Sequence, residues 1–348
     1  MSAVRALPVP TGGFRRIAVV RLSSLGDVVL TLPVVHALRA AWPEAEMQYW
    51  VKEEYAAVVR HDPAVTRVRA LERDARRLED LVSMSAELED RDLVVDLHGS
   101  LRSRVLTFRL PGPVLRLRGR RLERERWVRA RWTGPAPLPH ATARYAEVVA
   151  PLGLVVSDPP RLALEPAAVA WAAEQRAAFA GRDVVALCPG ARHATKCWPE
   201  ERWCELEAAL ASAGVARVVL STPAEQRAMP RLAEQVARSE GAVWATEPLE
   251  RSMAWLARCT TAVTHDSGLM HVAAACGTPV VAIFGSTSPV LGFSPCGPGH
   301  AVLCRELSCQ PCTVHGRDRC PRGHFRCMLE IPVDDVLARV RERLPVAP

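Results

Sequence analysis

The chain has 348 residues, a length that suits two domains better than one, and 49% hydrophobic and 24% charged residues, which excludes a disordered protein. No apolar run approaches the length of a membrane-spanning helix, and the first residues lack the apolar block of a secretory signal. We therefore expect a cytoplasmic protein, and the net charge of +7 favours an anionic partner.

The first half of the chain is predicted to alternate strands and helices. After a flexible leader (1–13), the apolar run 16–22 is typical of a buried parallel strand and ends in the loop 23–27. Apolar residues then recur at helical spacing from Val28 until Trp42 and Pro43. Further strands are predicted at 47–51, 65–70 and 93–97, the last followed by His98-Gly99-Ser100. This order predicts one half of a doubly wound α/β sheet.

Arginines are concentrated in one segment. Eight of them lie between Arg116 and Arg131, against two glutamates. The segment could bind phosphorylated lipid at an anionic membrane surface, and it could equally be a solvated loop. No nucleic-acid motif accompanies it, so we expect no nucleic-acid partner.

The second half repeats the pattern of the first. An irregular stretch at 155–166 is predicted to be the linker. Strands are predicted at 184–187, 218–221, 242–245, 262–264 and 280–284, with helices starting near 199, 224, 249 and 269. An amphipathic helix is predicted at 333–344. We expect an N-terminal domain at 14–160, a second parallel α/β domain at 161–330, and a C-terminal helix and tail at 331–348.

Three loops follow predicted strands, where ligands bind in open α/β sheets. They are 23–27, 189–199 and the start of 264–285. If the loop-bearing ends of the two sheets face each other, the three loops meet across the cleft between the domains. None has the spacing of a Walker A loop or a dinucleotide fingerprint. A helix that begins after Ser267 would attract phosphate, although Asp266 and Ser267 could simply cap it.

Three motifs together resemble the ADP-heptose:lipopolysaccharide heptosyltransferases of glycosyltransferase family 9. They are RLSSLGDVVLTLPV (21–34), PGARHATKCWPEERW (189–203) and HDSGLMHVAAACGTPVVAIFG (265–285). The resemblance covers most of the chain. It implies a GT-B-type α/β fold of two Rossmann-like domains facing across a cleft, with the nucleotide sugar bound by the C-terminal domain. It also implies an inverting transfer that requires no catalytic metal.

An inverting transfer needs one carboxylate to accept the acceptor proton and positive groups to hold the leaving diphosphate. The resemblance assigns the base to Asp27, a residue that could otherwise be a helix N-cap. It assigns the contact with the donor diphosphate to Lys196, because a flexible ammonium suits phosphate. These two residues are the predicted catalytic pair.

Further residues are predicted to bind the donor. Asp266 would bind donor hydroxyls, and the backbone of the following helix turn would bind phosphate. Glu225 is placed by the resemblance, loosely, on the nucleotide ribose. The predicted donor-binding residues are Arg192, Glu225, Asp266, Ser267, Gly268, Leu269 and His271. The residues predicted to contact donor or acceptor are Ser23, Ser24 and Gly26, which could also have ordinary turn roles.

Four of the 11 cysteines lie close together near the C-terminus. Cys309, Cys312, Cys320 and Cys327 could hold a structural zinc ion, or could be packed free thiols, since their intervals are shorter than those of common zinc modules. Disulfides are not expected in a reducing cytoplasm. The resemblance implies that many family members with a similar C-terminal stretch carry these cysteines and that the reaction needs no metal, so any ion here would be structural.

The sequence thus predicts an enzyme that moves heptose from ADP-heptose to the lipid A-core acceptor of the lipopolysaccharide inner core. We expect it to be cytoplasmic and peripheral at the inner face of the inner membrane. Two alternatives remain open at this point. One is a family 9 transferase with another donor or surface glycan. The other is a non-enzymatic protein that binds anionic glycolipid or a membrane surface.

Overall fold

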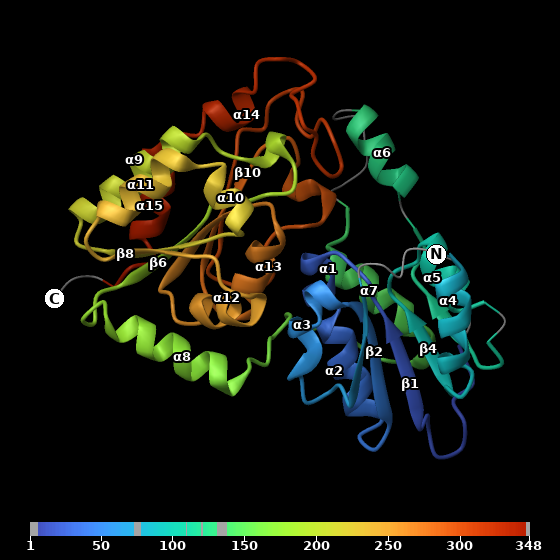
Figure 1. Ribbon diagram of the computed structural model, residues 1–348. Helices are drawn as coiled ribbons and strands as arrows, with labels where there is room; N and C mark the ends of the chain where they lie inside the picture. Colours follow the sequence, from blue (N-terminus) through green and yellow to red (C-terminus); the bar gives the residue numbers. More distant parts are fainter. Residues whose placement is uncertain (1–5, 73–77, 109, 120, 131–137, 346–348) are drawn as a thin grey trace. The chain divides into compact units, whose positions relative to one another are not determined.

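The computed structural model describes residues 6–72, 78–108, 110–119, 121–130 and 138–345 (Figure 1). The chain forms two compact units: unit 1 comprises Met1–Arg120 and Pro139–Ala163, and unit 2 comprises Arg121–Leu138 and Leu164–Pro348. The boundary expected at residue 160 lies close to Ala163, whereas residues 121–138 group with unit 2. No helix in these described ranges combines the length and the apolar character needed to cross a bilayer.

Unit 1 is built on a parallel five-stranded sheet of order β3-β2-β1-β4-β5. Its strands are β1 (Arg16–Val20), β2 (Glu46–Lys52), β3 (Arg67–Leu71), β4 (Leu93–Asp96) and β5 (Val114–Arg116). The central strand β1 pairs with β2 and β4, so that Val19 lies opposite Tyr49 and Val95. The four strands predicted from apolar runs are confirmed. The edge strand β5 is only half-buried and has no such run, so it was not predicted.

Helices cover this sheet. They are α1 (Leu25–Leu30), α2 (Leu32–Ala41), η1 (Glu53–Tyr55), α3 (Ala57–Arg60), α4 (Leu78–Ser85), η2 (Ala86–Leu88), α5 (Leu101–Leu106), α7 (Ala141–Val149) and η3 (Ala150–Leu152). The single helix predicted from Val28 is divided at Thr31. Pro33 has no N–H to donate to the carbonyl of Val29, so a continuous helix would lose a hydrogen bond there.

Unit 2 contains a parallel six-stranded sheet of order β11-β10-β9-β6-β7-β8. Its strands are β6 (Val184–Cys188), β7 (Ala216–Leu220), β8 (Ala242–Ala245), β9 (Thr261–His265), β10 (Val280–Phe284) and β11 (Ala301–Cys304). The five predicted strands are confirmed. The missed strand β11 again lies at an edge and is incompletely buried. When the strands of unit 2 are numbered from β6 as the first, their order is 3-2-1-4-5-6, which is that of a Rossmann fold. Unit 1 has the same order but lacks the sixth strand.

The helices of unit 2 include α15, which was predicted without a docking place. Its apolar residues Val336 and Val340 are buried in the same core cluster as Trp198 and Trp203. The helices are α6 (Arg121–Ala130), α8 (Pro166–Ala177), η4 (Ala194–Lys196), α9 (Glu200–Ser212), α10 (Pro223–Arg227), α11 (Pro230–Arg238), α12 (Leu249–Leu256), α13 (Gly268–Ala275), η5 (Pro289–Leu291), α14 (Arg326–Leu329) and α15 (Val333–Arg341). The unpredicted helix α11 follows α10 after a break at Met229.

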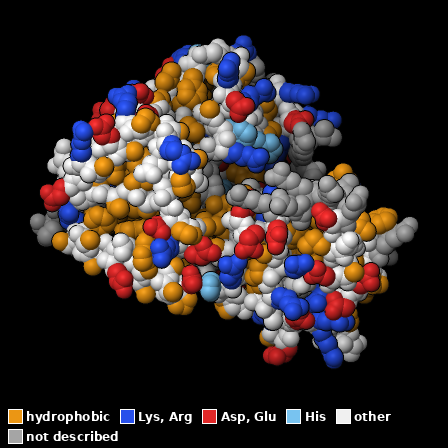
Figure 2. All heavy atoms as spheres, viewed as in Figure 1, with side chains coloured by type: hydrophobic (Ala, Val, Ile, Leu, Met, Phe, Trp, Pro, Cys, Tyr) orange, Lys and Arg blue, Asp and Glu red, His pale blue; other side chains and the backbone are white. Residues whose placement is uncertain are grey.

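The arginine-rich segment does not form one uniform patch. Arg116 belongs to β5, and its Nε donates to the buried carboxylate of Asp96 at 2.8 Å. The guanidinium of Arg124 in α6 stacks over Phe293. Arg120, Arg131 and Trp132 lie outside the described residues. On the face shown in Figure 2, acidic and basic side chains are interspersed where they are coloured.

Candidate active site

Each sheet has one topological switch point, where strand order reverses and ligands bind in Rossmann-like folds. In unit 1 it lies between β1 and β4, and in unit 2 between β6 and β9. Two of the three motifs found in the sequence, 189–203 and 265–285, follow β6 and β9. The third, 21–34, follows β1. The candidate site residues therefore form one cluster in each unit.

Asp27 is the centre of the cluster in unit 1. It occupies the third position of α1, and Ser24 is the N-cap. The N-cap interpretation of Asp27 is therefore wrong, because the helix begins one turn earlier than its apolar spacing indicated. Asp27 Oδ2 accepts hydrogen bonds from Ser24 N at 3.2 Å and Ser24 Oγ at 2.8 Å, which stabilises this first turn.

Two further residues hold the Asp27 carboxylate. Arg21, only 8% exposed, places its guanidinium 2.8 Å from Oδ2, and Tyr145 donates its hydroxyl to Oδ1 at 2.7 Å. Arg21 is itself fixed by donating to the carbonyl of Leu97 at 2.7 Å and lies against the Tyr145 ring. Both carboxylate oxygens are thus oriented: Oδ2 by Arg21, which directly follows β1, and Oδ1 by Tyr145 of α7.

The protonation state of Asp27 follows from these contacts. Burial raises the pKa of the carboxyl, but the Arg21 charge and the hydrogen bonds from Tyr145 and Ser24 outweigh it, so the pKa lies well below its usual range. Burial likewise raises the pKa of Tyr145 far above 10, so this phenol is a donor. Asp27 is therefore an anion throughout the physiological pH range, with the negative charge of a proton acceptor.

The loop after β4 forms the other wall of this switch point. The buried Asp96 accepts the backbone N–H groups of His98 at 3.0 Å and Gly99 at 2.9 Å, and so shapes the turn. Gly99 has φ of +62°, and a side chain there would meet the carbonyl of Leu117. Burial, with the nearby Arg21 charge, lowers the pKa of His98 to about 4, so its ring is neutral at pH 7.

In unit 2, three neighbouring strand ends bring Lys196, Asp266 and Thr287 together. Lys196 Nζ lies 2.8 Å from Asp266 Oδ2, and Thr287 Oγ1 donates to the same oxygen at 2.7 Å. These residues follow β6, β9 and β10, which are adjacent in the sheet. The structure thus joins two of the predicted residues in an ion pair and adds Thr287, which sequence reasoning missed.

The loop that carries Lys196 is anchored on both sides. Trp198 N donates to Nε2 of the buried His265 at 2.8 Å, which ties the loop to β9. Burial lowers the pKa of His265 to about 3, so that Nε2 remains an acceptor. On the other side, the hydroxyls of Thr195 and Ser286 lie 2.8 Å apart. Lys196 therefore extends from a rigid turn, with most of its side chain buried.

Helix α13 begins beside this ion pair. Ser267 is the N-cap, in extended conformation, and its hydroxyl makes no side-chain capping bond. Gly268 and Leu269 are the first two helical residues, so their N–H groups have no partner within the helix. His271 is buried, at 5% exposure, in the next turn. The predicted phosphate-binding amides thus lie next to Asp266 and Lys196 in sequence and in the fold.

The remaining predicted donor residues make no hydrogen bond or salt bridge with this ion pair among the described residues. Glu225 is the third residue of α10, and its Oε2 accepts from Thr222 N at 2.8 Å and Thr222 Oγ1 at 2.9 Å. Its Oε1 lies against Gly190, where a Cβ would be only 2.1 Å away. Arg192 is exposed, and no ion pair is found for it among the described residues.

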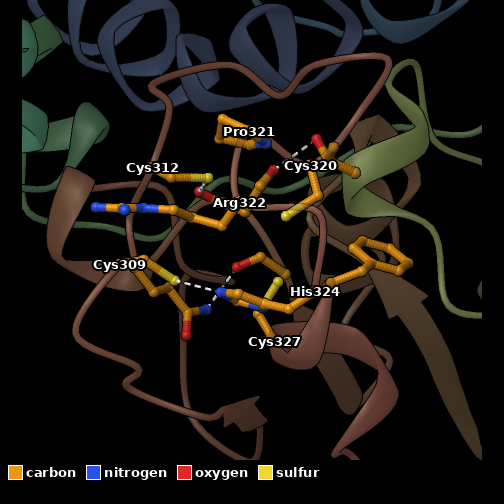
Figure 3. A pocket seen from close by; sticks show the side chains of 12 residues that line it. Cys309, Cys312, Cys320, Pro321, Arg322, His324 and Cys327 are labelled. Carbon is orange, nitrogen blue, oxygen red and sulfur yellow. Dashed lines mark hydrogen bonds between the residues drawn. The ribbon is translucent and has the colours of Figure 1, made fainter.

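The four C-terminal cysteines are free thiols that line one small cavity with His324 (Figure 3). Within the described part of the chain, no three His, Cys, Asp or Glu side chains form a ready metal site. The cysteines lie in residues 305–325 and in α14, between β11 and the helix that closes unit 2.

Two Rossmann-like units, each with a parallel sheet and polar residues at its switch point, have the architecture of the GT-B class. The model of glycosyltransferase family 9 (heptosyltransferase) matches residues 81–320. The chain belongs to this family and is a glycosyltransferase. The interpretation as a non-enzymatic binding protein is therefore not retained.

Curated relatives agree with this assignment. Lipopolysaccharide heptosyltransferase 1 of Pseudomonas aeruginosa is 30% identical over 320 residues, covering 85% of this chain and 86% of that protein. The Escherichia coli K12 protein of the same name is 30% identical over 296 residues, covering 79% and 89%. Lipooligosaccharide heptosyltransferase 2 of Haemophilus influenzae is 28% identical over 53% of this chain and only 55% of its own length.

Solved structures share the fold. A family 9 glycosyl transferase from Veillonella parvula gives a TM-score of 0.76 at 21% identity, covering 94% of this chain and 96% of that one. Escherichia coli heptosyltransferase WaaC with ADP gives 0.68 at 22% identity, covering 94% and 100%. At these identities the likeness supports the GT-B fold.

Proposed function

We propose that the enzyme transfers heptose from ADP-heptose to the inner core of lipopolysaccharide, by a single displacement with inversion, and that Asp27 is the base. The relatives named above are lipopolysaccharide heptosyltransferases, and one related structure contains ADP. The observation that carries the mechanism is the Asp27 carboxylate, kept ionised and oriented on both oxygens at the switch point of unit 1.

The proposed step is one displacement at the anomeric carbon. The acceptor hydroxyl oxygen forms a bond to that carbon while the bond to the ADP oxygen breaks. The hydroxyl proton passes to Asp27, and ADP leaves with the electron pair. Because Arg21 and Tyr145 hold the carboxylate, it needs little reorganisation before it accepts the proton.

The leaving diphosphate gains negative charge in this step, and unit 2 supplies positive groups for it. The Lys196 ammonium is held near α13 by Asp266, whose Oδ2 also accepts the hydroxyl of Thr287. The unpaired N–H groups at Gly268 and Leu269 add the positive end of that helix. We assign Asp266 to donor hydroxyls as well as to Lys196. Arg192 and His271 are secondary candidates for donor contacts.

The acceptor is proposed to be the anionic lipid A-core at the inner face of the inner membrane. Arg126 and Arg129 of α6 are exposed and could contact acidic sugars or phosphates. Ser23 and Ser24 precede Asp27 in the same loop and are proposed contacts for substrate hydroxyls. Gly26 is buried in the first turn of α1 and is a further proposed contact for substrate.

The test is an Asp27→Ala variant assayed for transfer and for donor binding. We expect turnover to be lost while ADP-heptose still stabilises the protein against thermal unfolding. Asp62→Asn is the matched control, because Asp62 is a buried carboxylate of unit 1 that pairs with His36 instead. Retained turnover in Asp27→Ala would refute the base. Thermal stabilisation by a UDP-sugar but not by ADP-heptose would indicate another donor.

A further inference from the structure

A cavity in unit 2 is bordered by four thiols that the transfer reaction does not use. Its volume is about 10 Å³, room for a single atom-sized guest. Cys309, Cys312, Cys320 and Cys327 line it, and Figure 3 shows them around the same space. They come from residues 305–325, which contain no helix or strand, and from the start of α14. A long irregular segment of this kind needs a stabilising element of its own.

Two of the sulfur atoms have a hydrogen-bonding neighbour: Cys309 Sγ lies beside the ring of His324, and Cys312 Sγ lies 3.7 Å from the carbonyl oxygen of Ser286, to which its thiol donates. His324 Nδ1 accepts the backbone N–H of Arg326 at 3.0 Å, so its proton lies on Nε2, which faces Cys309 Sγ at 3.6 Å. Donors of this kind stabilise thiolates more than thiols, and they are the usual outer partners of metal-bound sulfur.

The charge around the cavity fits the same chemistry. Four thiolates around a divalent ion leave an excess of two negative charges. Arg322 lines the cavity, and Arg317 and Arg319 are exposed in the same segment. No carboxylate lines the cavity among the described residues, so Arg322 is the charged side chain on its wall.

We propose that Cys309, Cys312, Cys320 and Cys327 bind one thiophilic divalent ion, Zn²⁺ or Fe²⁺, in tetrahedral sulfur coordination. His324 then serves as a hydrogen-bond donor to Cys309. Within the described residues no three of these side chains are already placed to hold an ion, so binding requires the thiols to move closer together. This site is separate from the proposed transfer chemistry, and its role is to order the segment that carries it.

That segment contacts the loop of Lys196 directly. Arg317 N donates to Thr195 Oγ1 at 2.8 Å, and Thr195 N donates to the carbonyl of Arg317 at 3.0 Å. Cys312 N also donates to the carbonyl of Ser286, whose hydroxyl meets that of Thr195. The metal therefore orders the backbone that positions Lys196, and its loss is expected to weaken binding of ADP.

The experiment is metal analysis of the full chain after growth with zinc and iron supplied separately. We expect about one zinc or iron per chain, as for a single four-sulfur site. Replacement by Co²⁺ should give thiolate-to-cobalt charge-transfer and tetrahedral d–d bands. Cys312→Ser and Cys327→Ser should each lose most of the bound metal. Cys204→Ser, which changes a partly buried thiol of α9, should keep it.

If the cysteine variants do not fold, metal removal from the wild-type protein followed by zinc uptake tests the proposal instead. After removal of metal with a chelator, the wild-type protein should take up one equivalent of Zn²⁺ and regain both thermal stability and ADP affinity. Failure of wild-type protein to take up zinc or iron would overturn the proposal, as would full metal content in both site variants. The readouts do not depend on transferase activity, so they stand whether or not Asp27 is the base.

Discussion

Tyr145 donates its hydroxyl to Asp27 Oδ1 at 2.7 Å, although the two residues are 118 positions apart in the chain. The bond joins α7 to the first turn of α1, and it fixes the oxygen that Arg21 does not contact. The carboxylate proposed as the base is thus oriented by an element from the far end of unit 1.

Tyr145→Phe keeps the ring beside Arg21 and removes only this hydrogen bond. We expect kcat to fall about tenfold, equivalent to ~1.4 kcal/mol, because the carboxylate is less well oriented. Steady-state kinetics with saturating ADP-heptose checks this. Tyr49→Phe, which removes a hydroxyl bonded to Thr31, is the control and should leave kcat unchanged. Equal losses in the two variants would indicate a general effect on folding.

Arg21→Met should change the pH dependence of transfer. The Arg21 charge lowers the pKa of Asp27 against the effect of burial, so removing this charge raises that pKa. Activity that needs ionised Asp27 should then fall at a higher pH than in the wild type and recover as the pH rises. Profiles of kcat/KM against pH measure the shift. An acid limb at an unchanged pH would contradict the assignment of Asp27 as the base.

Asp27→Asn should lower stability as well as activity. The variant leaves the buried Arg21 without its counter-charge, which costs about 3 kcal/mol in unfolding free energy. The folded-state pKa of Asp27 is depressed, so its contribution is present above the unfolded pKa of about 3.9 and is lost as the pH falls below it. Urea unfolding at pH 7 and pH 3 measures this. The difference between wild type and variant should shrink at pH 3.

Lys196→Ala should lower both kcat and donor affinity, because the ammonium is proposed to contact the diphosphate before and during departure. Thr287→Val removes a hydrogen bond to Asp266 and leaves Lys196 in place, so we expect a smaller loss, mainly in KM. Isothermal titration with ADP and steady-state kinetics separate the two effects. Unchanged ADP affinity in Lys196→Ala would refute the diphosphate contact.

The ribose contact proposed for Glu225 can be distinguished from its capping role. Glu225→Gln preserves a side chain able to cap Thr222, whereas Glu225→Ala removes both functions. A carboxylate that binds ribose should give weaker ADP binding in both variants, with lower thermal stability only in Glu225→Ala. If Glu225→Gln binds ADP as the wild type does, the residue is a helix cap alone.

The sequence predicted the fold well where apolar runs fill the sheet centres. The strands around β1 and β6 are fully buried on both faces, and such strands are visible as continuous apolar runs. The short, partly buried edge strands β5 and β11 were missed, whereas β3 and β8, which are also partly exposed edge strands, were predicted. The break between α1 and α2 could have been read from Pro33, but the apolar spacing continues across it.

The candidate site was predictable only in part. Asp27, Lys196 and Asp266 lie in short motifs, and their residue types carry the chemistry. Arg21 opens the same motif as Asp27, but nothing in the motif indicates that its guanidinium pairs with that carboxylate, and Tyr145 lies in a different segment altogether. Their contact with Asp27 is a product of tertiary packing, so no local pattern could indicate it. Thr287 is a further case, since it follows β10 without any motif of its own.

The chain changes units at three points, between residues 120 and 121, 138 and 139, and 163 and 164. A single cut at the boundary near residue 163 would therefore not separate two independent halves. The N-terminal piece would retain α6 and Leu138, whose N–H donates to the carbonyl of Val290 in unit 2 at 3.0 Å. Chimeras that exchange unit 1 between related transferases should accordingly exchange two separate stretches, 1–120 and 139–163, and keep residues 121–138 with unit 2.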